Sequence, residues 1–432
     1  MSELEGKERY RPKFHFTPAE KWMNDPNGLV YYEGEYHLFY QYYPEDSVWG
    51  PMHWGHAVSR DLVRWAHLPI ALYPDRLGYI YSGSVVIDWR GSAGFGAEAM
   101  VAIFTYHDPI TKYQSQGLAY SVDKGRNWSK YEGNPVIEAI VDMPDFRDPK
   151  VVWYEEEEGA GHWVMVVAAS AEKAILFYQS SNLIEWRLVS RFGDGLGGRE
   201  GLWEMPELFP LMVTETGEVK WVLMVGVDAG APAGGTGTQY FVGTFDGYRF
   251  VSEGGDGSVL WVDYGADFYA AQIWNDEPGG RRIGVGWMSN WLYGLKVPTE
   301  GWRGVFSVPR ELSLVVTEEG ERLVQRPVVE LAQWRRGERW WRQEVVGAER
   351  PLVMAVGGQQ MEIKAAMRLG VGVGEVELGF YYGEEKAAAL VYERAGRAYR
   401  FERYALATTQ FSELFAAEHV VGGGDEGGVL RW

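Results

Sequence analysis

The chain has 432 residues, of which 46% are apolar and 23% charged, the composition of a globular protein of about two domains. Its formal net charge of −19 disfavours binding to nucleic acid or to an anionic membrane surface, because like charges repel. It has no cysteine, so disulfides, thiolate metal sites and cysteine nucleophiles are excluded.

The beginning of the chain does not resemble a targeting segment. Residues 1–14 are mostly polar and charged, without the apolar stretch of a signal peptide. No stretch of the chain approaches the ~18 consecutive apolar residues of a membrane span. We therefore expect a soluble cytoplasmic protein, or a secreted one if a leader has been removed.

Short runs rich in β-branched and aromatic residues follow one another through the first three-quarters of the chain. Examples are EYHLFYQYY at 35–43, MVAIFTYH at 100–107, HWVMVVAAS at 162–170, KWVLMVGV at 220–227 and RRIGVGWM at 281–288. Glycine, asparagine, aspartate and proline separate these runs, and no sustained helical periodicity occurs before about residue 325. The sequence therefore predicts an all-β region.

Two series of degenerate motifs recur through this region. The first consists of SRDLVRW, SVDKGRNW, SSNLIEW and TFDGYRF, which start at Ser59, Ser121, Ser180 and Thr244, or 62, 59 and 64 residues apart. The second keeps a similar spacing and consists of WMNDPNG, YSGSVVI, FRDPKVVW, LWEMPELF and DFYAAQIW. A period near 60 over some 300 residues predicts five four-stranded blades of a β-propeller, whose axial pocket would receive one motif from each blade.

The pattern changes after residue 310. Residues 311–336 contain a strand, a turn and a short helix-like stretch, which we interpret as a linker after a propeller domain at 1–310. Alternating apolar and polar residues then return at 337–432, which favours a C-terminal β-sandwich. The last residues, from His419, are rich in glycine and show no clear final pair of strands.

Three acidic residues lie in the second series of motifs, at the same phase of different repeat units. They are Asp25 in WMNDPNG, Asp148 in FRDPK and Glu204 in WEMPELF. Arg147 would keep the neighbouring Asp148 ionised, and the apolar neighbours of Glu204 would raise the pKa of its carboxyl group. Two carboxyl groups tuned in different ways are what a retaining glycosidase needs for its nucleophile and its general acid.

These motifs resemble glycoside hydrolase family 32, which comprises invertases, levanases and exo-inulinases. The matching segments run in family order from residue 14 to about 312, and they are FHFTPAEKWMNDPNGLVYYEGEYHLFYQYYP, WGPMHWGHAVSRDLVRWAHLPIAL, YSGSVV, FRDPKV, WEMPEL, DFYAAQIW, GWMSNW and GWRGVFSVPREL. The resemblance implies a five-bladed propeller followed by a β-sandwich, with no cofactor and no metal.

The resemblance also implies roles for individual residues. It makes Asp25 the nucleophile, Asp148 the transition-state stabiliser and Glu204 the acid/base. Residues at positions where the family contacts the fructosyl unit are Asn24, Gln41, Trp49, Tyr81, Ser82, Arg147 and Trp291. The implied substrates are sucrose, fructo-oligosaccharides and fructans such as inulin and levan.

The chain departs from the family pattern in two places. The family usually has Cys-Pro-Asp after the acid/base glutamate, whereas this chain has Met205-Pro206-Glu207. The late sandwich motif of the family, an Asp-Arg-Ser-Ser-Val-Glu-Val-Phe-like strand, has no counterpart before Trp432, so the sandwich is divergent or truncated.

Two other functions use the same motifs. A fructosyltransferase would pass the fructosyl group to a sugar instead of water, and a non-catalytic propeller would only bind fructosides. The His53-x-x-His56 spacing is compatible with a metal, but on a strand these two side chains would face opposite sides. The sequence does not rank sucrose, inulin and levan, and it does not indicate an oligomeric state.

Overall fold

The computed structural model describes residues 8–157, 159–254, 257–354, 360–406, 409–423 and 429–431. Its regular secondary structure is almost entirely β-strand, with the 3-10 helices η1 (Gly294–Lys296), η2 (Val329–Trp334) and η4 (Glu413–Phe415). No helix within these ranges is long and apolar enough to cross a membrane.

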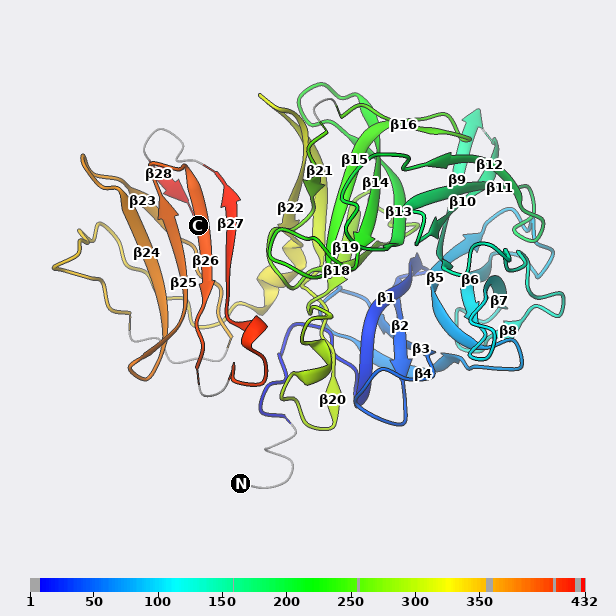
Figure 1. The fold of residues 1–432 in the computed structure, drawn as a ribbon, viewed down its shortest axis with the longest axis horizontal. Coiled ribbons are helices and arrows are strands. Elements are labelled where there is room, and N and C mark those ends of the chain that lie inside the picture. The colour runs from blue at the N-terminus through cyan, green and yellow to red at the C-terminus, as the bar shows by residue number, and fades with distance from the viewer. Residues whose placement is uncertain are drawn as a thin grey trace.

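Five antiparallel sheets make up the first part of the chain (Figure 1). The first sheet contains β1 (Lys21–Tyr32), β2 (Glu35–Tyr43), β3 (His53–Ser59) and β4 (Ala66–Leu72), and the second contains β5 (Tyr79–Asp88), β6 (Ala99–His107), β7 (Gln114–Ser121) and β8 (Ser129–Lys130). The third contains β9 (Phe146–Glu157), β10 (Ala160–Ala169), β11 (Ala174–Ser180) and β12 (Arg187–Phe192), and the fourth contains β13 (Trp203–Met212), β14 (Val219–Val227), β15 (Gly237–Phe245) and β16 (Phe250–Ser252). The fifth contains β18 (Tyr269–Ile273), β19 (Arg282–Trp287), β21 (Arg310–Thr317) and β22 (Gly320–Pro327). Two further short strands add to these sheets. Strand β17 (Leu260–Trp261) pairs with β15 of the fourth sheet, and β20 (Trp302–Arg303) pairs with β1 of the first.

The first strands of the five sheets form a closed ring. In chain order β1 contacts β5, β5 contacts β9, β9 contacts β13 and β13 contacts β18, and β18 returns to contact β1. These first strands contain the five motifs of the second repeated series, from WMNDPNG in β1 to DFYAAQIW at β18. The five-bladed propeller predicted from that series is confirmed.

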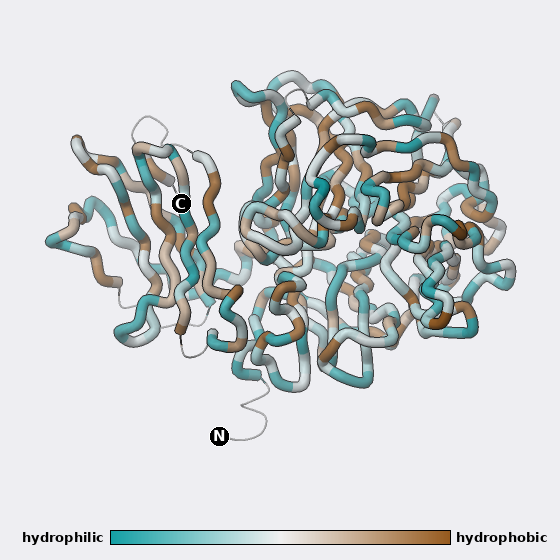
Figure 2. The backbone as a smooth tube through the Cα atoms, in the orientation of Figure 1, coloured by the Kyte–Doolittle hydropathy of each residue, from teal (hydrophilic) through white to brown (hydrophobic). Residues whose placement is uncertain are grey.

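The apolar core is divided into five clusters, one between each pair of neighbouring sheets. Strand β10 shows why its sequence is apolar almost without interruption. Trp163 and Met165 pack toward the second sheet, whereas Val164 and Val166 pack toward the fourth. Alternate residues of a blade strand thus face two different neighbouring blades, and both faces are buried. Figure 2 shows apolar stretches along many strands and polar stretches in many of the connecting loops.

The first repeated series forms the turn between the third and fourth strands of the first four sheets. In the first of these turns the Asp61 carboxylate accepts the backbone N–H groups of Val63 and Arg64. Asn182 does the same for Ile184 and Glu185 in the third sheet. A side-chain oxygen that accepts two backbone amides thus fixes the same tight turn in both of these blades.

The predicted end of the propeller at residue 310 needs a correction. Residues 311–336, expected to be a linker, contain nearly all of β21 and all of β22, and both strands belong to the fifth sheet. Only η2 and the few residues after it follow that sheet. The fifth blade needs these strands because β19 would otherwise have an unpaired edge.

The C-terminal part forms two further sheets that stand to one side of the propeller (Figure 1). One contains β24 (Glu375–Tyr382), β25 (Glu385–Glu393), β26 (Ala398–Arg403) and β27 (Ala417–Gly422), and the other pairs β23 (Ala366–Arg368) with β28 (Val429–Arg431). Residues 420–422 and 429–431 therefore lie in strands, contrary to the expectation from the glycine content of this segment. They pair with β26 and β23, which lie far earlier in the chain.

Candidate active site

Each of the five first strands contains a β-bulge at the same level of the propeller. Two consecutive residues of the first strand lie opposite one residue of the second strand, which breaks the regular ladder. The bulges are Asn24–Asp25 opposite Gln41, Tyr81–Ser82 opposite Thr105, Asp148–Pro149 opposite Val167, Met205–Pro206 opposite Val225, and Ala270–Ala271 opposite Gly286. A bulge re-aims the side chains beside it. Nearly all predicted site residues lie in a bulge, next to one or opposite one.

Asp25 lies in the bulge of β1 and contacts the bulge of β5. Its Oδ2 accepts a hydrogen bond from the Ser82 hydroxyl at 3.1 Å, while its Oδ1 has no hydrogen-bond partner among the described residues. Burial, and next the negative charge of Glu204, raise the pKa of Asp25 to about 6. One carboxylate oxygen thus accepts a hydrogen bond, and the other is buried without one.

Asp148 lies in the bulge of β9 and is held from two neighbouring blades. Its backbone N–H donates to the Thr105 hydroxyl at 3.0 Å, and its Oδ2 accepts the backbone N–H of Met205 at 3.0 Å. Both Asp148 and Met205 have positive φ, 66° and 49°, a conformation that non-glycine residues rarely adopt. The strained backbone of β13 is therefore what presents an amide to Asp148.

Glu204 is bound by charged and polar groups. Arg147 donates from Nε at 3.1 Å and from Nη2 at 2.8 Å to Glu204 Oε1, and the Tyr269 hydroxyl donates to Oε2. The apolar setting expected for Glu204 is therefore wrong. Its neighbours Trp203 and Met205 turn into the core, because successive residues of a strand face opposite sides.

Arg147 donates hydrogen bonds to Glu204 and not to its sequence neighbour Asp148. Its Nε is 4.0 Å from Asp148 Oδ2, whereas its hydrogen bonds go to Glu204, to Asp145 at 2.7 Å and to Gln114 at 3.3 Å. Burial raises the pKa of Asp148, and the charge of Arg147 opposes this rise without cancelling it. The expectation that Arg147 keeps its sequence neighbour ionised is corrected accordingly.

The other predicted site residues fall into two groups. Buried Gln41 donates to the Ile80 carbonyl at 3.1 Å, and Asn24 accepts the indole N–H of Trp22 at 2.8 Å, so both belong to the packed wall of the site. Trp49 is 41% exposed and meets Tyr81 edge to face at 6.2 Å. Trp291, in the loop before η1, stacks on Trp22 at 5.8 Å.

Two residues of this network were missed by sequence reasoning. Tyr269 binds Glu204, and Thr105 binds the backbone of Asp148. Tyr269 lies in DFYAAQIW, the fifth member of the second repeated series, so the repeat itself indicated its position. Thr105 lies in the second strand of its blade, and only the pairing of β5 with β6 brings it to the site.

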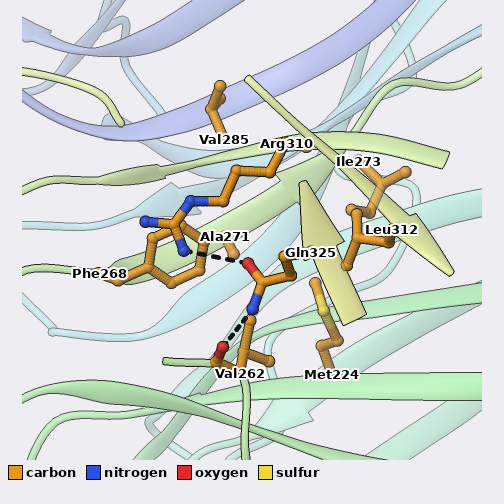
Figure 3. A pocket seen from close by; sticks show the side chains of 10 residues that line it. Met224, Val262, Phe268, Ala271, Ile273, Val285, Arg310, Leu312 and Gln325 are labelled. Carbon is orange, nitrogen blue, oxygen red and sulfur yellow. Dashed lines mark hydrogen bonds between the residues drawn. The ribbon is translucent and has the colours of Figure 1, made fainter. Parts of the chain in front are cut away.

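A small cavity elsewhere is unsuited to a sugar. It lies between the fourth and fifth sheets, has room for only about 10 Å³ and is lined mostly by apolar side chains such as Phe268 and Leu312. Figure 3 shows that Arg310 and Gln325 are joined by a hydrogen bond beside it. About one water would fill this space.

The histidines do not form a metal site. His56 is buried, with its Nε2 3.1 Å from Nδ1 of His37, whereas His53 binds the Pro51 carbonyl. Among the residues that the structure describes, no three histidine, aspartate or glutamate side chains are grouped closely enough to hold a metal ion.

Comparisons with known proteins identify the family of the chain. Residues 15–327 match the model of the glycosyl hydrolases family 32 N-terminal domain. The chain belongs to glycoside hydrolase family 32. Over 417 residues it is 48% identical to a levanase of Bacillus subtilis strain 168, covering 94% of this chain and 60% of that protein. The chain thus spans less than two-thirds of the length of this curated relative.

Two solved structures share nearly the whole architecture of this chain. An exo-inulinase from Aspergillus awamori superposes with a TM-score of 0.81 and 31% identity, covering 98% of this chain and 88% of that one. A β-fructofuranosidase from Schwanniomyces occidentalis, complexed with fructosyl-erythritol, superposes with a TM-score of 0.77 and 30% identity, covering 98% and 86%. These structures extend the similarity beyond the propeller into the C-terminal sheets.

Proposed function

We propose that this family 32 chain is a retaining, exo-acting β-fructofuranosidase. Its reaction would be hydrolysis of terminal, non-reducing β-D-fructofuranosyl residues of sucrose, fructo-oligosaccharides and fructans. The observation that supports this most strongly is the meeting of Asp25, Asp148 and Glu204 in one buried network, each at the bulge of a different blade. Relatives named levanase, exo-inulinase and β-fructofuranosidase support the substrate class.

The first step assigns one task to each acid. The free Oδ1 of Asp25 attacks the anomeric carbon as the bond from that carbon to the leaving oxygen breaks, and Glu204 gives its proton to that oxygen. Asp148, held by the Met205 amide, stabilises positive charge on the sugar ring in the oxocarbenium-like transition state. Arg147 and Tyr269 fix the direction of the Glu204 carboxyl group.

The second step reverses the roles of Glu204. A water gives one proton to the Glu204 carboxylate and attacks the anomeric carbon, and the bond to Asp25 breaks, so that both acids return to their starting states. The Tyr269 hydroxyl suits this exchange, because a hydroxyl group donates to an ionised carboxylate and accepts from a protonated one.

The test uses Asp25→Asn, which keeps the shape of the side chain and removes its charge. Wild-type protein should release fructose from sucrose, inulin or levan, and the variant should lose at least about a thousandfold in kcat, with Tm at pH 5 within a few degrees. Release of fructose by the variant at the wild-type rate would contradict the role of Asp25. Binding of fructosides without turnover by the wild-type protein would favour the non-catalytic function.

The same samples separate hydrolysis from transfer. We expect fructose to dominate the products even at high sucrose, since the chain resembles hydrolases, and a dominant yield of trisaccharides would instead indicate a fructosyltransferase. Initial rates on sucrose, inulin and levan rank the substrates. The cytoplasmic location, and the absence of nucleic-acid and membrane partners, stay predictions.

A further inference from the structure

One polar side chain from each first strand lies just beyond the bulges, at the centre of the propeller. We call these five residues the axial belt. Each follows a bulge residue of its own strand by two positions and is at most 3% exposed, and the five are Asn27, Ser84, Lys150, Glu207 and Gln272. The belt therefore lies two or three residues beyond the acids along their strands and is closed to solvent.

Side chains of the belt bind the backbones of neighbouring blades. Asn27 accepts the N–H of Gly83 at 3.3 Å, and Gln272 donates to the carbonyl of Gly83 at 3.0 Å. Ser84 donates to the Pro149 carbonyl at 3.0 Å and accepts the N–H of Val151 at 2.9 Å. These bonds join β1, β5, β9 and β18 at the point where the bulges interrupt each blade's own ladder.

Within the axial belt, the contact between β9 and β13 is an ion pair. Lys150 Nζ lies 2.9 Å from Glu207 Oε2, and the two side chains are 2% and 0% exposed. Lys150 also donates to the Ile273 carbonyl at 2.9 Å, while the Ile273 N–H donates to Glu207 at 3.3 Å. The pair thus joins β9, β13 and β18, which contain Asp148, Glu204 and Tyr269.

A buried ion pair is costly in desolvation, and hydrophobic residues of similar volume often stabilise a fold equally well. Its presence at this point calls for a function other than stability. Strands β9 and β13 belong to different sheets and share no backbone ladder, so side-chain contacts must set their register. At the level of the acids these contacts are Arg147 with Glu204 and Asp148 with the Met205 amide. The Lys150–Glu207 contact supplies a fixed length between them.

We propose that the Lys150–Glu207 ion pair is a positioning device that sets the separation of Asp148 from Glu204 and from the Met205 amide. This inference rests on the proposed function. Asp148 precedes Lys150 by two residues and Glu204 precedes Glu207 by three, so a shift between the strands changes the distance between the acids directly. A misplacement of about 1 Å costs on the order of a hundredfold in rate.

The test separates positioning from stability. Lys150→Met leaves the buried Glu207 without its counter-ion, and Glu207→Gln does the same to Lys150, so each single variant should lower Tm. The double variant Lys150→Met/Glu207→Leu removes both charges at similar volume but leaves the N–H and C=O of Ile273 without these partners, so its Tm should lie above those of the single variants and below that of the wild type. Its kcat on sucrose should nevertheless stay ~10–100-fold low with KM changed less than about threefold.

A control removes a partly buried ion pair that lies outside the axial belt. Arg281 and Glu277, 3.0 Å apart, lie in the turn between β18 and β19, and the Glu277 side chain is 2% exposed. Arg281→Met/Glu277→Leu should lower Tm and leave kcat unchanged. Wild-type values of both Tm and kcat in the Lys150→Met/Glu207→Leu variant would overturn the proposal.

A readout without turnover keeps the two proposals apart. The Met205 amide donates to Asp148, so its hydrogen exchange should accelerate at least tenfold in the Lys150 and Glu207 double variant and not in the control. If the wild type released no fructose, the proposed function would fail and this exchange would still test the positioning. If the Lys150→Met/Glu207→Leu variant did not fold, the variant Lys150→Gln/Glu207→Gln would replace it. A wild-type kcat and wild-type hydrogen exchange of the Met205 amide in that replacement would refute the proposal.

Discussion

Asp25 and Glu204 differ in the number of donors around each carboxylate. Asp25 accepts the Ser82 hydroxyl and lies near the charge of Glu204, whereas Glu204 accepts three hydrogen bonds from Arg147 and Tyr269. A nucleophile must be ionised and a general acid must be protonated before each turnover. Single contacts in this network should therefore move the pH dependence of the reaction.

The acidic limb of the pH profile should report Asp25 together with Asp148, because both act as carboxylates. The Asp25 pKa of about 6 predicts that kcat/KM on sucrose falls as the pH drops below 6, because only ionised Asp25 attacks. The Ser82 hydroxyl favours the ionised form, so Ser82→Ala should move this limb to higher pH. Ser190→Ala, in outer strand β12, is the control, and an unmoved limb in Ser82→Ala would contradict the assignment.

Tyr269 should contribute to the rate through its hydroxyl alone. Tyr269→Phe keeps the buried ring and removes the donor to Glu204, so kcat should fall about tenfold or more, since hydrogen bonds to a charged group are worth ~1.5–3 kcal/mol. Tyr240→Phe is a matched control, because its hydroxyl accepts the Leu323 N–H within the core between the fourth and fifth sheets. Equal kcat losses in the two variants would argue against a specific role for Tyr269.

At the scale of the strand, the bulge is the element that builds the site. The sequence showed five motifs at one phase, but the bulges themselves depend on which residue of the second strand lies opposite. Gln41, Thr105 and Gly286 determine that pairing from positions at least 14 residues away in the chain. Sequence periodicity therefore located the first strands and not the irregularity that re-aims the acids.

The backbone of Met205 gives a test at this scale. Its φ of 49° disfavours β-branched residues, so Met205→Val should cost ~1–3 kcal/mol in the free energy of unfolding and weaken the amide bond to Asp148. Met205→Leu is unbranched at Cβ and similar in volume, and it should stay within ~1.5 kcal/mol of the wild type. Denaturant unfolding and kcat measure both variants, and equal behaviour of the two would argue against backbone strain at this bulge.

At the scale of the molecule, five apolar clusters hold the blades and the polar axial belt holds their first strands. The C-terminal sheets are attached to the fifth blade by a polar contact, in which Arg403 of β26 binds Asp267 and donates to the Tyr293 hydroxyl at 3.0 Å. Tyr293 in turn donates to Asp267 at 2.6 Å. The segment just before β18, whose first residue is Tyr269, is thus bound to the C-terminal sheets.

Burial of the acids should make stability depend on pH. A carboxyl group whose pKa is raised on folding stabilises the protein at low pH, and this contribution is lost as the pH rises through the folded-state pKa, about 6 for Asp25. Asp25→Asn removes the cost of ionisation and should raise the free energy of unfolding by ~2–3 kcal/mol at pH 7.5 and by much less at pH 4.

Urea unfolding at the two pH values measures this difference. Exposed Asp142→Asn serves as the control and should change neither value by more than ~0.5 kcal/mol. A stabilisation by Asp25→Asn that is the same at pH 4 and pH 7.5 would contradict the raised pKa of Asp25.

The sequence by itself determined the five-fold repeat, the all-β class and the motifs that contain Asp25, Asp148 and Glu204, because repeated strands and turn residues are local patterns. Only the tertiary structure decided which groups bind each acid. Arg147 adjoins Asp148 in sequence and binds Glu204 in space, and Lys150 finds its counter-ion on the next blade. A strand directs successive side chains to opposite faces, and a bulge resets that direction, so neighbours along the chain are poor guides to neighbours in the site.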